Sequence, residues 1–220
     1  GFASIAMSQQ KVSIRQVQYV DDVKLAGCRD TSAYHGDTVT IVGRVIMDGN
    51  LCELVSSSVQ GGFRPGVHLV DTAKNSTMGD FKGIQVMGTY VSGATTLPIT
   101  SIYDLVAGMV VEVTGIVGTF QGETQLTPLN NSSIKVLGTG SAPTAVKIDL
   151  GLLNDNARTN KLPTGEQYEG SFVELENVIV TAVSYFSGNT LISFDVKDAN
   201  GNVINVSDRF MAQKLKTYST

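Results

Sequence analysis

The sequence predicts an all-β protein built from small β-barrels with a few short helices. Glycine accounts for 23 of the 220 residues, valine, threonine and serine are abundant, and tryptophan is absent. Short runs in which apolar and polar residues alternate are separated by turns rich in glycine and asparagine, which is typical of strands and hairpins. With 42% hydrophobic residues and 16% charged residues, the chain can bury one large β domain or two small ones.

Residues 1–36 are expected to form an apolar arm, a strand and a loop. The start, "GFASIAMSQQ", resembles the tail of a secretory signal, although an apolar arm that docks elsewhere is an open alternative. The next run, "VSIRQVQYV" at 12–20, alternates well enough to predict an opening strand.

Residues 37–138 are predicted to form the first barrel. "PITSIYDLVAG" at 98–108 has apolar residues at helical spacing and predicts a short helix that ends at Gly108. Strands are predicted on both sides of it, at 38–47, 67–71, 82–87, 109–117, 122–128 and 132–138.

Residues 139–167 are rich in proline, glycine and asparagine and are predicted to be a linker that carries one short strand at 145–149. Residues 168–220 then repeat the start of the first barrel, with expected strands at 170–183, 191–198 and 201–210. A final helix is expected at 211–220, and two strands of the second copy are missing. Half a barrel leaves strand edges unpaired. We therefore expect either that the natural chain continues beyond Thr220 or that another segment or subunit supplies the strands, with residues 2–7 and 12–20 as candidates.

The order strand, strand, strand, helix, strand, strand is that of an OB-fold, a five-stranded Greek-key barrel. "TVTIVGRVI", "GVHLVD", "FKGIQV", "GMVVEVTGIVGTFQGETQL", "YEGSFVELENVIVTAV" and "FDVKDANGNVINVS" resemble the OB-type domains of secreted, multidomain bacterial surface proteins, including those attached to extracellular nucleases. The resemblance covers about residues 37–210. It implies an exported, non-catalytic module, because none of the catalytic motifs of those nucleases is present here.

The chemistry-bearing residues indicate no enzyme and no cofactor. His35 lies in a predicted loop and His68 in a predicted strand, and neither has a nucleophile at a recognisable spacing. The net charge of −4 provides no global field to attract phosphate groups, which counts against nonspecific binding of nucleic acid. A membrane span is not expected, since no stretch approaches the required length of about 20 apolar residues.

Two cysteines, Cys28 and Cys52, flank the first strong strand. In a secreted protein they would pair as a disulfide, and in a cytosolic protein they would be two separate thiols. Their spacing matches no zinc pattern, so no metal site is predicted.

OB-type domains present ligands on the face of their second and third strands and bind single strands through aromatic stacking and basic groups. In this sequence that face, together with the tip of the later hairpin, would carry the candidate ligand-binding residues Phe63, Arg64, His68, Lys82, Gln85, Tyr90 and Phe120. The alternative is that these aromatic residues pack against the barrel ends or a neighbouring domain.

We therefore expect a non-catalytic extracellular structural module, a subunit of a cell-surface or filamentous assembly joined by strand or barrel contacts. Its expected partners are other copies of itself or other domains of the same secreted protein. The alternative function is an OB-type binding module for single-stranded nucleic acid or oligosaccharide.

Overall fold

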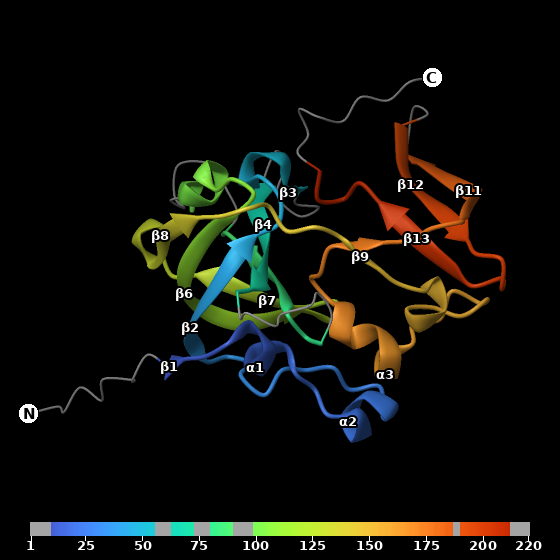
Figure 1. Cartoon of the computed structure of the whole chain (residues 1–220), viewed down its shortest axis with the longest axis horizontal. Helices are drawn as coiled ribbons and strands as arrows, with labels where there is room; N and C mark the ends of the chain where they lie inside the picture. Colours follow the sequence, from blue (N-terminus) through green and yellow to red (C-terminus); the bar gives the residue numbers. More distant parts are fainter. Residues whose placement is uncertain (1–9, 56–62, 73–79, 90–98, 187–189, 212–220) are drawn as a thin grey trace, which may run out of the picture.

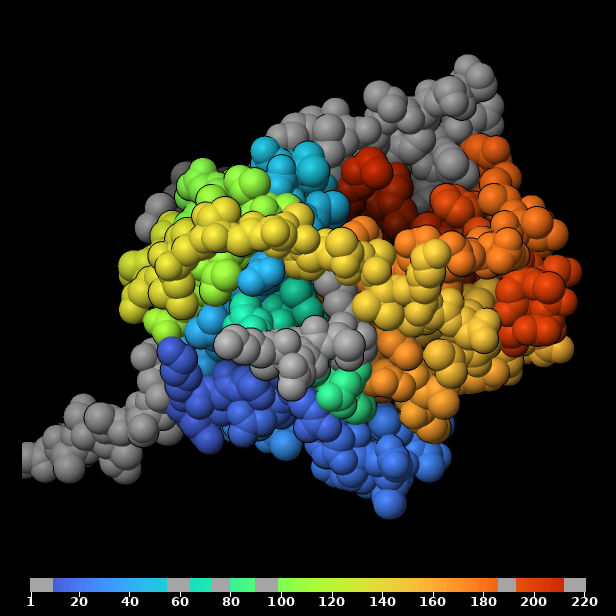
Figure 2. Space-filling view, viewed as in Figure 1, coloured from blue at the N-terminus to red at the C-terminus, as the bar shows by residue number. Residues whose placement is uncertain are grey.

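The computed structural model describes residues 10–55, 63–72, 80–89, 99–186 and 190–211. Its first part is one large sheet, and its second part contains a two-stranded and a three-stranded sheet. The chain crosses from one part to the other after β8 (Ile134–Thr139), in the yellow segment that runs over the surface in Figures 1 and 2.

Five strands of the first part pair in a closed circuit, which we call the ring: β2 (Thr38–Val45), β4 (Phe63–Asp71), β5 (Gly83–Met87), β6 (Met109–Phe120) and β7 (Glu123–Pro128). β2 pairs antiparallel with β4, and β4 with β5. β5 pairs parallel with β7, and β7 pairs antiparallel with β6. β6 then pairs antiparallel with β2, which closes the circuit. This order is the OB-type Greek-key order, so the predicted OB-type fold is confirmed for this part of the chain.

Alternate residues of the ring strands point inward and form the main hydrophobic core, as the period of two predicts. Ile41, Leu69, Ile84 and Leu126 are all completely buried. Tight turns hold the strands in this register. At the tip of the hairpin between β6 and β7, Gln121 and Gly122 both have positive φ, 54° and 93°, as a two-residue hairpin turn requires.

Short helical elements close the ends of the ring. The expected helix at 98–108 is present as the 3₁₀ turn η3 (Thr100–Asp104), and its Ile102 is fully buried. The remaining short elements of the first part are α2 (Asp22–Ala26), η1 (Gly49–Leu51), β3 (Glu53–Val55), which pairs with β4, and η4 (Asn131–Ser133).

The predicted strand at residues 12–20 is wrong. Only β1 (Gln10–Lys11) is a strand there, and it is followed by the helix α1 (Ile14–Gln18). The reason is a capping box, in which the Ser13 side chain accepts the backbone N–H of Gln16 and the Gln16 side chain accepts the backbone N–H of Ser13. This segment therefore cannot be donated as a strand, and Ile14 and Val17 pack into the core instead.

The predicted linker contains more structure than expected. The expected short strand is present as β9 (Val146–Lys147), which pairs parallel with β10 (Val173–Glu174). Between them lie η5 (Leu150–Leu152), α3 (Leu162–Gly165) and η6 (Glu166–Tyr168). The linker expectation therefore fails here, because Leu150, Asn154 and Glu166 are buried rather than solvated.

The chain ends in an antiparallel meander that we call the open sheet: β11 (Ile179–Phe186), β12 (Thr190–Lys197) and β13 (Val203–Ser207). Its antiparallel order is the same as that of β2, β4 and β5. β12 is central, so β11 and β13 are edge strands within the described residues. The expected helix at 211–220 lies outside them apart from Met211, and so does the arm at 1–9.

Candidate ligand face and neighbouring cavity

The outer face of β4, β5 and β7 is the surface on which a ligand was predicted. Arg64 and His68 lie on β4, Gln85 lies on β5 and Lys82 immediately precedes it. Phe120 ends β6 at the hairpin tip. Phe63 is the first residue of β4, and Tyr90 lies outside the described residues.

A row of polar side chains crosses this face, because their residues are register partners on neighbouring strands. His68 lies opposite Gln85, and Gln85 lies opposite Gln125. Gln125 Nε2 donates to Gln85 Oε1, and Gln85 Nε2 lies 3.4 Å from His68 Nε2. The row ends at Glu123, whose Oε1 is 3.9 Å from His68 Nε2. Gln85 is fully buried although it lies on the outside of the ring, so another segment must cover it.

Part of that cover is Arg209–Met211, which we call the strap. The Phe210 ring meets the His68 ring edge to face with centroids 6.2 Å apart, and the Phe210 carbonyl accepts the backbone N–H of Glu53 at 2.7 Å. Met211 forms an antiparallel bridge with Cys52, which extends the edge of β3.

Arg209 ties the strap to the hairpin tip. Its guanidinium lies over the Phe120 ring, 5.4 Å from the centroid, and Nη1 donates to Gln121 Oε1 at 3.0 Å. Phe120 at this tip is therefore half-buried, because Arg209 of the same chain lies over its ring. The strap occupies the face where a ligand was predicted.

A second segment covers the other end of the same face. Phe81 N–H donates to the Gln167 carbonyl at 2.9 Å, and Thr124 N–H donates to Glu169 Oε1 at 2.8 Å. Gly83 and Gly170 touch through their backbones, since a Cβ on Gly83 would lie 2.4 Å from the Gly170 carbonyl carbon. Glycine at both positions permits this approach.

The two predicted basic residues also have partners within the chain. Arg64 Nε donates to the Gly88 carbonyl at 2.7 Å. Lys82 Nζ lies 4.0 Å from Asp80 Oδ2, and only 12% of its side chain is exposed.

The cysteines are separate thiols, so the disulfide alternative is absent from this structure. Cys28 is exposed and Cys52 is buried. Burial raises the pKa of the Cys52 thiol to about 12, with smaller contributions from Glu123 and Glu53. The thiol therefore stays protonated and unreactive at neutral pH.

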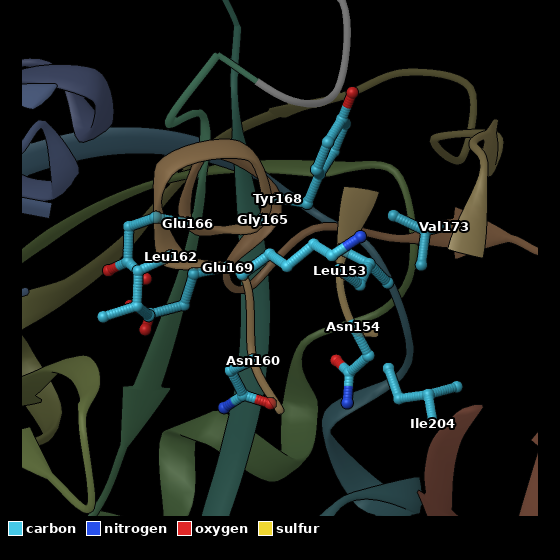
Figure 3. Close-up of a pocket in the computed structure, with 11 residues that line it drawn as sticks. Leu153, Asn154, Asn160, Leu162, Gly165, Glu166, Tyr168, Glu169, Val173 and Ile204 are labelled. Carbon is cyan, nitrogen blue, oxygen red and sulfur yellow. The ribbon is translucent and has the colours of Figure 1, made fainter. Parts of the chain in front are cut away.

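A cavity of about 210 Å³ adjoins the segment that covers the ring. Figure 3 shows Glu166, Leu162 and Glu169 on one side of it, Val173 and Ile204 on the other, and Asn154 and Asn160 below. Sequence reasoning missed this site, because its walls come from the region read as a linker and from β10 and β13.

The two glutamates in the cavity wall have strongly shifted pKa values. Burial raises the pKa of Glu166 to about 7, and the nearby negative charge of Asp30 adds to the shift. Burial also raises the pKa of Glu169 to about 8, followed by repulsion from Glu166. Perturbed carboxyl groups beside a cavity are typical of functional sites, although buried structural groups show the same shifts.

Metal ligands and membrane-spanning helices were sought in the described ranges. Among the residues that the structure describes, no three His, Cys, Asp or Glu side chains come together as metal ligands. None of the helices in the same ranges is long and apolar enough to span a membrane.

Comparison with known proteins identifies no family. No family model matches the chain, and no curated protein matches it. One similar solved structure is the second OB-fold domain of replication protein A from Methanococcus maripaludis, with 15% identity, a TM-score of 0.30 and coverage of 48% of this chain and 89% of that one. Another is a putative aspartyl-tRNA synthetase from Leishmania major Friedlin, with 12% identity, a TM-score of 0.30 and coverage of 72% of this chain and 26% of that one. The OB-type order of the ring rests on the strand pairings of this chain itself.

Proposed function

We propose that this chain is a non-catalytic structural module that self-associates through its open sheet, as a subunit of an extracellular bacterial surface assembly. The observation that carries the proposal is a set of exposed apolar side chains on that sheet, together with Phe172, which immediately precedes β10. They are Phe172, Ile179, Val180, Val183, Tyr185 and Val206. Apolar patches of this kind mark interaction surfaces in soluble proteins.

The free edge of β11 supports association by strand pairing. Natural edge strands are protected by charged residues, proline, bulges or a covering segment. Residues 179–186, "IVTAVSYF", contain no charge and no proline. β11 does have one protective feature, because its pairing with β12 contains two register shifts. Because the strand is uncharged, two copies can approach edge to edge without electrostatic repulsion.

In this proposal the ring is an OB-type barrel spanning 37–138, and the open sheet belongs to a second, partial barrel at 168–220 completed by a neighbouring copy. The extracellular setting follows from the resemblance of the strand segments to secreted surface domains. It is tested separately, by locating the protein in fractionated cells of its source with an antibody.

Sedimentation velocity of the full chain tests the association. We expect dimers or larger species at micromolar concentration, and a shift to monomer in Val180→Lys. Val136→Lys is the matched control, because Val136 lies on β8 and is 54% exposed against 59% for Val180. A wild-type chain that stays monomeric at all concentrations would contradict self-association.

A second candidate function uses the face beneath the strap to bind single-stranded nucleic acid or oligosaccharide. It is favoured by the gathering of His68, Phe120, Arg209 and Phe210 on that face. Such a ligand would have to displace the strap. Titration with a fluorescent oligonucleotide at low salt, repeated with Phe120→Ala and Lys82→Ala, tests this function, and the absence of binding at low salt removes it.

A further inference from the structure

The Glu166 carboxyl group in the cavity wall has no partner that explains its burial. The residue is 8% exposed, and within the described part of the chain no backbone or side-chain group donates a hydrogen bond to the carboxyl. Its electrostatic neighbours, Asp30 and Glu169, are acidic too. The carboxyl oxygens are not among the fully buried unpartnered side-chain atoms of the described residues, so they keep some accessible surface in the wall of the cavity.

The second carboxyl group is fixed in place by the ring. Glu169 Oε1 accepts the backbone N–H of Thr124 at 2.8 Å, so this side chain cannot turn away from Glu166. Glu169 is also affected by the charge of Glu123 on the hairpin. The fold therefore holds two carboxyl groups together beside the cavity.

The cation in the cavity wall does not neutralise this pair. Lys161 lines the cavity, but its Nζ donates to the Gly151 carbonyl at 2.8 Å. Its charge lowers the pKa of Asp155, and the ion pairs of the described residues include none between Lys161 and Glu166 or Glu169. A compensating positive charge would have to come from a molecule that enters the cavity.

The rest of the wall defines the chemistry of such a molecule. Leu162, Val173 and Ile204 provide apolar surface. Asn154 Nδ2 donates to the Arg158 carbonyl, which leaves its side-chain oxygen as an acceptor. Hard metal ions prefer a shell of six or more oxygen atoms, which this partly apolar cavity does not offer. An ammonium group with an alkyl body matches both the carboxyl pair and the apolar wall.

We propose that the cavity binds a small primary alkylammonium ion, whose N–H groups donate to Glu166 and Glu169 and whose alkyl chain lies against Leu162, Val173 and Ile204. The volume of about 210 Å³ is below that of ordinary small-molecule sites, so the ligand is about the size of a short-chain amine. This site is independent of self-association through the open sheet.

Calorimetric titration of the full chain with n-butylammonium tests the proposal, with n-pentanol as an uncharged probe of similar shape. At pH 8.5 both carboxyl groups are largely ionised while an alkylammonium remains protonated. We expect saturable binding of butylammonium, no saturable binding of pentanol, and at least a tenfold loss of affinity in Glu166→Gln. Glu176→Gln is the matched control, because that carboxyl is exposed and pairs with Lys147.

A second measurement on the unaltered chain keeps the test independent of the variant. Near pH 7.5, binding of a cation must expel protons from the carboxyl pair, so the apparent heat of binding should change with the ionisation enthalpy of the buffer. Absence of saturable binding, equal binding of pentanol, equal affinity in Glu166→Gln, or heat that is independent of the buffer would each overturn the proposal.

Discussion

The ring and the open sheet begin with the same antiparallel meander but differ in what they bury. In the ring, β6 pairs with β2 and closes the circuit, and the inward residues of all five strands are buried together. In the open sheet, no strand within the described residues closes the circuit, and the β11 side chains at positions 179–185 are all exposed. Alternation of apolar residues along the strands therefore does not create a core by itself. The core forms where the sheet closes on itself.

The second part compensates for its small core by packing against the ring. Its contacts with the ring include the strap at one end of the ligand face and the segment around Glu169 and Gly170 at the other. We expect the ring to be the stable unit and the second part to depend on it.

The largest effect is expected in the ring core. Leu69→Ala leaves a cavity among fully buried neighbours and should lower the free energy of unfolding by about 3 to 4 kcal/mol. Leu150→Ala, in the second part, should cost about 2 kcal/mol, because Leu150 is buried but lies outside the main core cluster. Urea unfolding monitored by circular dichroism measures both values. Equal losses of unfolding free energy in Leu69→Ala and Leu150→Ala would contradict the expectation that the ring is the more stable part.

Gly83→Ala should separate the two parts. The new Cβ would lie 2.4 Å from the Gly170 backbone, so the second part must move and the stability should fall by about 2 to 3 kcal/mol. Limited proteolysis should then cut residues 150–211 before the ring. Gly118→Ala is the control, because a Cβ there meets nothing within 4 Å. Similar proteolysis of the two variants would show that the interface is not tightly packed.

Elements of the first part differ in how well the local sequence predicts them. The hairpin of β6 and β7 is predicted correctly, because apolar alternation and the Gln121–Gly122 turn are local signals. The spacing of Ser13 and Gln16 is that of a capping box and encodes the helix α1, whereas the alternation of apolar residues in the same segment is typical of a strand.

The candidate site was less predictable because its contacts join distant parts of the chain. His68 and Gln85 are correctly placed on one face from strand order alone. The strap could not be predicted, since Arg209 and Gln121 are 88 residues apart and meet only after the second part has folded over the ring. The burial of Glu166 has the same origin, because nothing in the local sequence distinguishes it from a solvated glutamate.

The packing of the second part on the ring should make stability depend on pH. The pKa values of Glu166 and Glu169 are raised in the folded chain to about 7 and about 8, so the folded state binds more protons than the unfolded state above pH 4.5. Stability should therefore fall as the pH rises from about 5 to 8 and level off above that range. Charges near this pair are those of Asp30, Glu123 and Lys161.

Glu169→Gln isolates this effect. It removes one ionising group from the pair and should recover about 1 to 2 kcal/mol at pH 8.5 with little change at pH 5. Thermal unfolding across this pH range measures the difference. Glu112→Gln is a contrasting variant, because the hydrogen bond with Lys11 lowers the pKa of Glu112. The fall of stability above pH 6 should therefore be the same in this variant as in the unaltered chain. If stability falls with pH in Glu169→Gln as it does in the unaltered chain, then another group causes the decline.

The smallest effect on stability is expected from Arg209→Ala, which loosens only the strap. The lost cation–π contact with Phe120 and the hydrogen bond to Gln121 together should cost less than about 1 kcal/mol. The local effect should be larger. Hydrogen exchange at the Glu53 amide, which donates to the Phe210 carbonyl, should accelerate, while exchange at the Thr124 amide, held by Glu169, should not change. If both amides accelerate together, the strap and the segment around Glu169 open as one unit, and the second part leaves the ring cooperatively rather than from the strap end.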